Sequence, residues 1–145
     1  MLNLFKKTEE KNNNTEIEID LIKITSLLIH AAKIDGNYSE KEKLIIRNFL
    51  KSINSKINFE DVIKKAEKDE NNSNQILKYT QEVKKNNSEF KSKIIKILWK
   101  IVLSDNNSDM YENTLMRRIA GLLYVPDKLV GDLKLEILKE NNKKL

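Results

Sequence analysis

The chain has 145 residues, of which 39% are hydrophobic, and this is enough for one domain with a substantial apolar core. It has no cysteine and a single histidine, which excludes disulfides, thiol chemistry and the usual Cys/His zinc sites. The formal net charge is +5, but the lysines are scattered among acidic residues and no aromatic residues alternate with them. We therefore expect a solvated Lys/Glu surface rather than a nucleic-acid patch.

The overall composition favours an all-α fold in the cytoplasm. Three glycines and one proline are few for a turn-rich β-protein, and they favour helices joined by short polar connections. No apolar run approaches the roughly 20 residues that span a bilayer. The apolar stretch at the start is shorter than the core of a signal peptide, which has about 7–15 residues.

The expected domain organisation has three parts. Residues 1–15 are polar and of low complexity, which predicts a flexible N-terminal arm. The apolar residues Leu2, Leu4 and Phe5 at its start leave a peripheral membrane contact open as a role for this arm. Residues 16–140 form the predicted helical domain, and residues 141–145 a frayed tail.

Apolar residues recur at helical spacing in seven segments of this domain. The first, over residues 16–33, and the fifth, which we expect Ser88 to cap, are apolar over most of their circumference and should be central. Pro126 suits the first turn of the last helix, because proline there loses no intrahelical hydrogen bond. The other helices are predicted at residues 39–53, 59–68, after a loop at 70–74, and at 109–123.

Two segments of the chain match one another at a constant offset of 70 residues. Leu27–Ile53 and Ile97–Leu123 each read as a helix, an acidic loop and an amphipathic helix. The matched polar pairs are Asp35/Asp105, Glu42/Glu112 and Arg47/Arg117. We therefore predict a compact all-α bundle of about seven helices with an internal pseudo-twofold repeat.

The two loops place oxygen-bearing side chains at alternate positions, as the opening of an EF-hand loop does. An EF-hand requires a bidentate Glu at position twelve, but this position is Ile46 when counted from Asp35 and Met116 when counted from Asp105. The loops are therefore not EF-hands. A shorter oxygen-ligand site for a divalent cation remains open.

Helix capping accounts for the later acid of each loop. Glu42 stands three residues after Ser39, and Glu112 three residues after Asp109, which is the spacing of a capping box. Each cap stabilises its helix by about 1 kcal/mol. Both glutamates also lie near the positive end of a helix dipole.

Capping does not account for the earlier acid of each loop. Asp35 and Asp105 follow a helix, where a carboxylate opposes the helix dipole unless it binds loop amides or a cation. Turn formation and the binding of a divalent cation or a partner therefore both stay open for these two residues. The candidate metal ligands are Asp35, Glu42, Asp105 and Glu112, with Asp35 and Asp105 preferred. Arg47 and Arg117 are predicted to pair with the loop acids.

At these residues the chain resembles the TerB family, the tellurite-resistance B proteins. Their mark is an alanine-rich helix, an A-D-G-x-[I/L]-x-x-x-E loop and an amphipathic helix, often duplicated. The first copy runs from Ala32 through Asp35 and Gly36 to Glu42, and the second from Leu103 to Glu112. The resemblance extends over nearly the whole chain. Ile34 and Ser104 replace the motif's alanine before each aspartate, and Asn106 replaces the second glycine.

The resemblance implies an all-helical TerB fold related to the N-terminal domain of a membrane-anchored DnaJ co-chaperone. It implies metal-linked or stress-linked scaffolding rather than an established catalytic activity, and its motif points to Asp35, Glu42, Asp105 and Glu112. Without cysteine the chain cannot reduce tellurite through its own thiols, so any role in resistance is indirect.

Three functions remain as hypotheses. The leading one is a non-enzymatic interaction protein whose acidic loops bind a divalent cation or another protein. The second is a basic nucleic-acid or membrane-surface binder, whose affinity would fall steeply with salt. The third is an enzyme using the sole histidine, His30, but the chain has no P-loop, nucleophile elbow or H-E-x-x-H motif. We predict no catalytic residue, and no cofactor beyond the cation.

Overall fold

The computed structural model describes residues 21–34, 38–72, 76–104 and 110–143, and all regular structure in them is helical. The first helix is described over residues 21–32 and is followed by six more. These are α2 (Glu40–Ile53), α3 (Phe59–Asn72), α4 (Ile76–Lys84), α5 (Ser88–Val102), α6 (Met110–Leu123) and α7 (Asp127–Lys143). The predicted all-α class is confirmed. The predicted arm, residues 1–15, lies outside these ranges.

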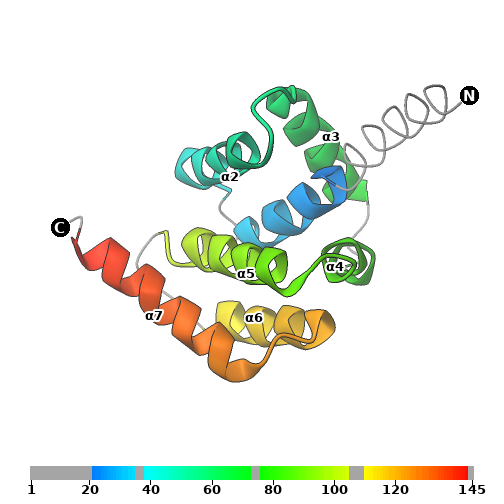
Figure 1. The fold of residues 1–145 in the computed structure, drawn as a ribbon. Helices are drawn as coiled ribbons and strands as arrows, with labels where there is room; N and C mark the ends of the chain where they lie inside the picture. The colour runs from blue at the N-terminus through cyan, green and yellow to red at the C-terminus, as the bar shows by residue number, and fades with distance from the viewer. Residues whose placement is uncertain (1–20, 35–37, 73–75, 105–109, 144–145) are drawn as a thin grey trace, which may run out of the picture.

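Helix α5 occupies the centre of the bundle. It contacts α2, α4, α6 and α7, and Figure 1 shows it between the group of the first helix, α2 and α3 on one side and the pair α6 and α7 on the other. Ile94, Ile95 and Leu98 of α5 are completely buried. Because neighbours cover it on several sides, an apolar surface around most of its circumference is the pattern it needs.

The first helix is buried in the same way. Its consecutive residues Leu27, Leu28 and Ile29 have no exposed surface, although consecutive helical residues point in directions about 100° apart. Its neighbours must therefore cover it on more than one face. The prediction that this helix and the fifth are the central ones agrees with their burial.

The helix caps agree with the sequence prediction at α2 and differ at α5. Ser39 caps α2 in a complete capping box with Glu42. The predicted cap of α5, Ser88, is instead the first helical residue, and the side chain of Asn87 accepts the Phe90 N–H at 2.9 Å. Asn87 and Ser88 are both good capping residues, and the extended backbone at Asn87 decides between them. The predicted cap at Ser73 lies outside the described residues.

Two helices are longer than predicted. Helix α3 continues to Asn72, so the loop predicted at 70–74 is wrong for residues 70–72. Helix α7 continues to Lys143, into the tail for which fraying is predicted from residue 141. The Asn141 side chain donates a hydrogen bond to the Leu103 carbonyl at 3.4 Å, and this contact holds the end of α7 against the end of α5.

Pro126 lies directly before the last helix and not in its first turn, where the sequence predicts it. It directly precedes α7, and its carbonyl accepts the Val130 N–H at 3.1 Å, so it occupies the N-cap position rather than the first turn.

The internal repeat stays a prediction, although matched core positions such as Ile46 and Met116 are both buried. None of the helices in the described ranges is long and apolar enough to cross a bilayer.

Candidate functional site

Two of the four predicted site residues are described by the structure. Glu42 and Glu112 each lie in the first turn of a helix, α2 and α6, and are 5% and 3% exposed. Asp35 and Asp105 lie outside the described residues. Within the described ranges, no three Asp, Glu, His or Cys residues are grouped closely enough to hold a metal ion.

The Glu42 carboxylate is engaged by the cap. Its Oε1 accepts hydrogen bonds from the Ser39 N–H and the Ser39 hydroxyl, both at 2.8 Å, while the Ser39 Oγ accepts the Glu42 N–H at 3.2 Å. This is the predicted capping box. The equivalent box at α6 depends on Asp109, which lies outside the described residues.

A hydrogen bond links residues that flank the two acidic loops. Lys41, in the first turn of α2, donates from Nζ to the Ser104 carbonyl at 2.6 Å, and Ser104 directly precedes the second loop. Helices α2 and α5 also pack against each other. The beginning of α2 and the end of α5 therefore lie at the same end of the bundle.

Tyr38 is the last residue before the cap of α2, and its hydroxyl is buried. No hydrogen-bond partner for this hydroxyl is found among the described residues. Burial, followed by the negative charge of Glu67, raises the pKa of Tyr38 well above its usual range, and Arg47 opposes this effect. The Lys43 ammonium lies 4.9 Å from the centre of the Tyr38 ring, within the range of a cation–π contact.

The predicted pairing of the two matched arginines with loop acids is not seen among the described residues. Arg47 Nε lies 2.7 Å from Glu60 Oε1, at the start of α3. Arg117 is exposed on α6, and no described residue forms an ion pair with it. Pairing of either arginine with Asp35 or Asp105 falls outside the described ranges.

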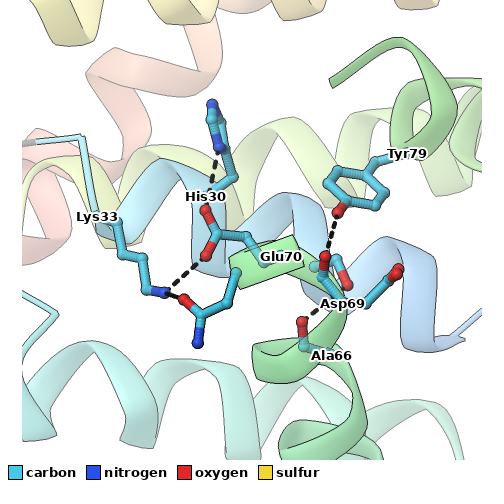
Figure 2. A network of polar contacts seen from close by, with 8 residues as sticks. His30, Lys33, Ala66, Asp69, Glu70 and Tyr79 are labelled. Atoms are coloured by element: carbon cyan, nitrogen blue, oxygen red, sulfur yellow. Dashed lines mark hydrogen bonds and ion pairs between the residues drawn. The ribbon is translucent and has the colours of Figure 1, made fainter. Parts of the chain in front are cut away.

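A second polar cluster lies between the first helix and the end of α3 (Figure 2). Glu70 is 6% exposed, and its Oε2 accepts a hydrogen bond from the Lys33 ammonium at 2.6 Å. The Oε1 of the same carboxylate lies 3.4 Å from Nδ1 of His30. Lys33 also donates to the Asn71 side chain at 2.7 Å. Nearby, the Tyr79 hydroxyl donates to the Asp69 carbonyl at 3.3 Å. The cluster joins the first helix to α3 through a buried charge.

The sequence prediction missed Glu70 because it ended α3 too early. Continuing the helical spacing of Val62, Ile63 and Ala66 by one more turn places Glu70 on the same buried face. An acid on an apolar helix face needs a basic partner, and Lys33, directly after the first helix, supplies one. The helical spacing was thus a usable signal for its burial.

A third feature is a cleft of about 520 Å³ lined by residues of α5, α6 and α7. Trp99, Met116 and Val130 contribute apolar surface, and the cleft is also lined by Asn113, Arg117, Asp127, Gly131 and Lys134. The Trp99 indole N–H donates to the Val130 carbonyl at 3.0 Å. The Lys134 ammonium lies 5.0 Å from the centre of the Trp99 ring and donates to the Asn113 side chain at 3.2 Å.

The family model of tellurite resistance protein TerB matches residues 21–135. Neither a curated protein nor a solved structure matches the chain. The matched range begins with the described part of the first helix and ends within α7, so it includes both buried helices and both acidic loops. The chain therefore belongs to the TerB family, as a helical module of the kind associated with tellurite resistance.

Proposed function

We propose that this chain is a non-enzymatic interaction module of the cytoplasm, which binds a divalent cation or another protein at its paired acidic loops. The observation that carries the proposal is the 2.6 Å hydrogen bond from Lys41 to the Ser104 carbonyl. It joins the flanks of two loops that are far apart in the sequence. Loops whose flanking residues meet at one end of the bundle can act on the same ligand.

The buried first turns support this proposal. Glu42 is held by Ser39 and is buried against the bundle, so it stabilises the start of α2 rather than reaching outward. A cation at the loops would therefore take its ligands from Asp35 and Asp105. Ca²⁺, Mg²⁺ and Mn²⁺ all prefer such carboxylate oxygens.

The arrangement of His30 supports a non-enzymatic role. His30 faces Glu70 at 3.4 Å and takes part in the contact between the first helix and α3. Neither the cleft at Trp99 nor a smaller one lined by Lys23 and Lys78 includes His30 among its described lining residues. A general base needs a substrate within hydrogen-bond reach, and a structural contact between two side chains does not.

Calorimetric titration tests the cation form of the proposal. Ca²⁺, Mg²⁺, Mn²⁺ and Zn²⁺ are titrated into the full chain, into D35A and D105A, and into D61A as a control, because Asp61 pairs with Lys65 on α3 away from the loops. We expect at least one of these cations to bind at micromolar concentration, each loop variant to weaken it by tenfold or more, and D61A to leave it unchanged. Millimolar binding that both loop variants retain would exclude the cation.

The partner form is tested by affinity capture from the native host. The full chain and the D35A/D105A double variant are immobilised in parallel, and captured proteins are compared. We expect a protein that the full chain retains and the double variant loses. A profile that is the same for both, together with a negative titration, would overturn the proposed function.

A further inference from the structure

We propose that the cleft between α5, α6 and α7, lined by Trp99, is a binding site for a ligand that combines a compact apolar body with a carboxylate. None of its described lining residues belongs to the acidic loops, and the site does not depend on the function proposed for them. Its volume of about 520 Å³ lies within the range of roughly 300–1,000 Å³ that is usual for ligand pockets.

The apolar part of the ligand is inferred from the residues of α5, α6 and α7 that line the cleft. Trp99, Met116 and Val130 all belong to the core and are 3%, 1% and 7% exposed. The indole is fixed by its hydrogen bond to the Val130 carbonyl, and the Lys134 ammonium lies near its ring. Only small parts of these side chains reach the cleft, where they form a fixed apolar floor against which an aromatic or bulky aliphatic group can lie.

The carboxylate is inferred from the charges around the cleft. Arg117 and Lys134 contribute two cations, and among the described residues that line the cleft Asp127 is the only acidic one. Asp127 lies in the first turn of α7, where the helix dipole favours its charge. Arg117 forms no ion pair with any described residue, and a guanidinium is well suited to bind a carboxylate through two parallel hydrogen bonds.

Gly131 provides an independent observation. It lies inside α7, where glycine weakens a helix, and it lines the cleft. A Cβ placed on Gly131 would meet no atom within 4 Å, so neighbouring residues do not require glycine here. Glycine at this position adds no side chain to the wall of the cleft. Gly121 in α6 has equally free space but does not line the cleft, which makes it a matched control.

Trp99 reports directly on binding, because it is the only tryptophan in the chain. Its indole N–H gives a single signal in a ¹H–¹⁵N correlation spectrum of the full chain. We would titrate 2-naphthoate as the apolar carboxylate and 2-naphthamide as its neutral counterpart. A blocked tetrapeptide of alternating glutamate and phenylalanine is the third probe, which separates a free organic acid from a peptide as the source of the same chemistry.

We expect naphthoate or the peptide to shift the indole signal saturably, and naphthamide to bind at least fivefold more weakly. R117Q should lower the affinity by about tenfold, as expected for the loss of one charge-assisted contact, while R118Q on the same helix should leave it unchanged. G131L should abolish binding by filling the cleft, and G121L should not. Saturation by naphthoate assigns the site to a free acid, and saturation by the peptide alone assigns it to a peptide.

Three results would overturn the proposal: no saturable shift with either carboxylate probe, equal affinity for naphthoate and naphthamide, or the same affinity in R117Q as in R118Q. R117Q changes an exposed side chain, so the test does not depend on G131L folding correctly. Repeating the naphthoate titration with D35A separates this site from the acidic loops, because that variant should bind naphthoate normally.

Discussion

Glu70 is a charged residue on a buried helix face, and its exposed fraction is 6%. Only 7% of its side-chain surface is exposed, and a carboxylate with so little water must be paired to remain ionised at low cost. Lys33 and Asn71 extend the contact to the surface, so the pair is only partly shielded from solvent. The cluster orients the first helix against α3 as well as satisfying a charge.

We expect E70Q to lower the free energy of unfolding by about 1–3 kcal/mol, because it removes the charge that the Lys33 ammonium faces inside the bundle. The matched control is E60Q, since Glu60 also pairs with a basic residue but its side chain is 51% exposed. An exposed pair of that kind contributes about 1 kcal/mol or less. Urea unfolding followed by circular dichroism measures both, and equal small losses would show that the Glu70 cluster adds nothing to stability.

The raised pKa of Tyr38 predicts that the fold loses stability at alkaline pH. Its pKa is raised in the folded state, mainly by burial, so the unfolded chain releases the proton first, at a pH of about 10. Stability is therefore fully present below that pH and falls as the pH rises toward the folded pKa. We expect Y38F to reduce this fall and to stay within about 1 kcal/mol of the parent at neutral pH. Thermal unfolding between pH 7 and 11 tests this, and an unchanged alkaline slope would contradict it.

At the scale of single helices, local capping determines where each helix starts. The capping boxes and dipole effects act over three or four residues, which is why the start of α2 at Ser39 follows from the sequence. At α5 two capping residues stand side by side, and the structure assigns the cap to Asn87. Such a choice depends on how the chain enters the helix.

The assignment of this cap is testable with a pair of alanine variants. N87A should cost about 1 kcal/mol, because it leaves the Phe90 N–H without its acceptor. S88A should change stability by only a few tenths of a kcal/mol, since serine is a weaker helix former than alanine and Ser88 lies within the helix. The denaturant midpoints of the two variants test the assignment. A larger loss of stability for S88A than for N87A would show that Ser88 is the cap.

The two helix-interior glycines provide a further prediction at this scale. G121A and G131A should each stabilise the fold by up to about 1 kcal/mol, because alanine is the better helix former and the added methyl group meets no neighbour. Melting temperatures from calorimetry measure the change. A decrease at either position would show that its backbone conformation or surroundings require glycine.

At the scale of the whole molecule, α5 supports the bundle from both sides. Helix α7 packs along it, through the Trp99 hydrogen bond to the Val130 carbonyl and the Asn141 contact with Leu103. Figure 1 shows α7 and α6 on the side of α5 opposite to α2 and α3. Removing α7 would expose one face of the central helix.

A chain that ends at Pro126 should therefore lose cooperative unfolding. Ile137 of α7 is completely buried and is removed with the helix, and the nearly buried Trp99 of α5 loses its cover. Each large apolar side chain that is deleted or uncovered in this way costs roughly 1.5–3 kcal/mol. The expected result is a broad thermal transition, with the Trp99 emission shifted to longer wavelength. A sharp transition close to that of the full chain would show that α7 is dispensable for the fold.

The sequence predicted the helical part of this protein well and its ion pairs poorly. The capping box at Ser39 and the central, apolar character of the first helix and α5 all follow from short-range spacing. Helix α3 is longer than predicted because its last turn is polar, and the residue that this turn buries is an acid, Glu70, rather than an apolar residue. Asp35 and Asp105, the residues on which the functional prediction rests, lie outside the described ranges, and their role stays a prediction.

The sequence by itself therefore determined the all-α class, the two central helices and the family, because apolar periodicity and loop motifs are properties of neighbouring residues. Only the tertiary structure decided that Glu70 pairs with a lysine 37 residues away, and that Lys41 reaches the residue before the second loop. It also decided that Trp99, Arg117 and Gly131 line one cleft. These contacts depend on how helices cross, and crossing is set by the packing of all the side chains together.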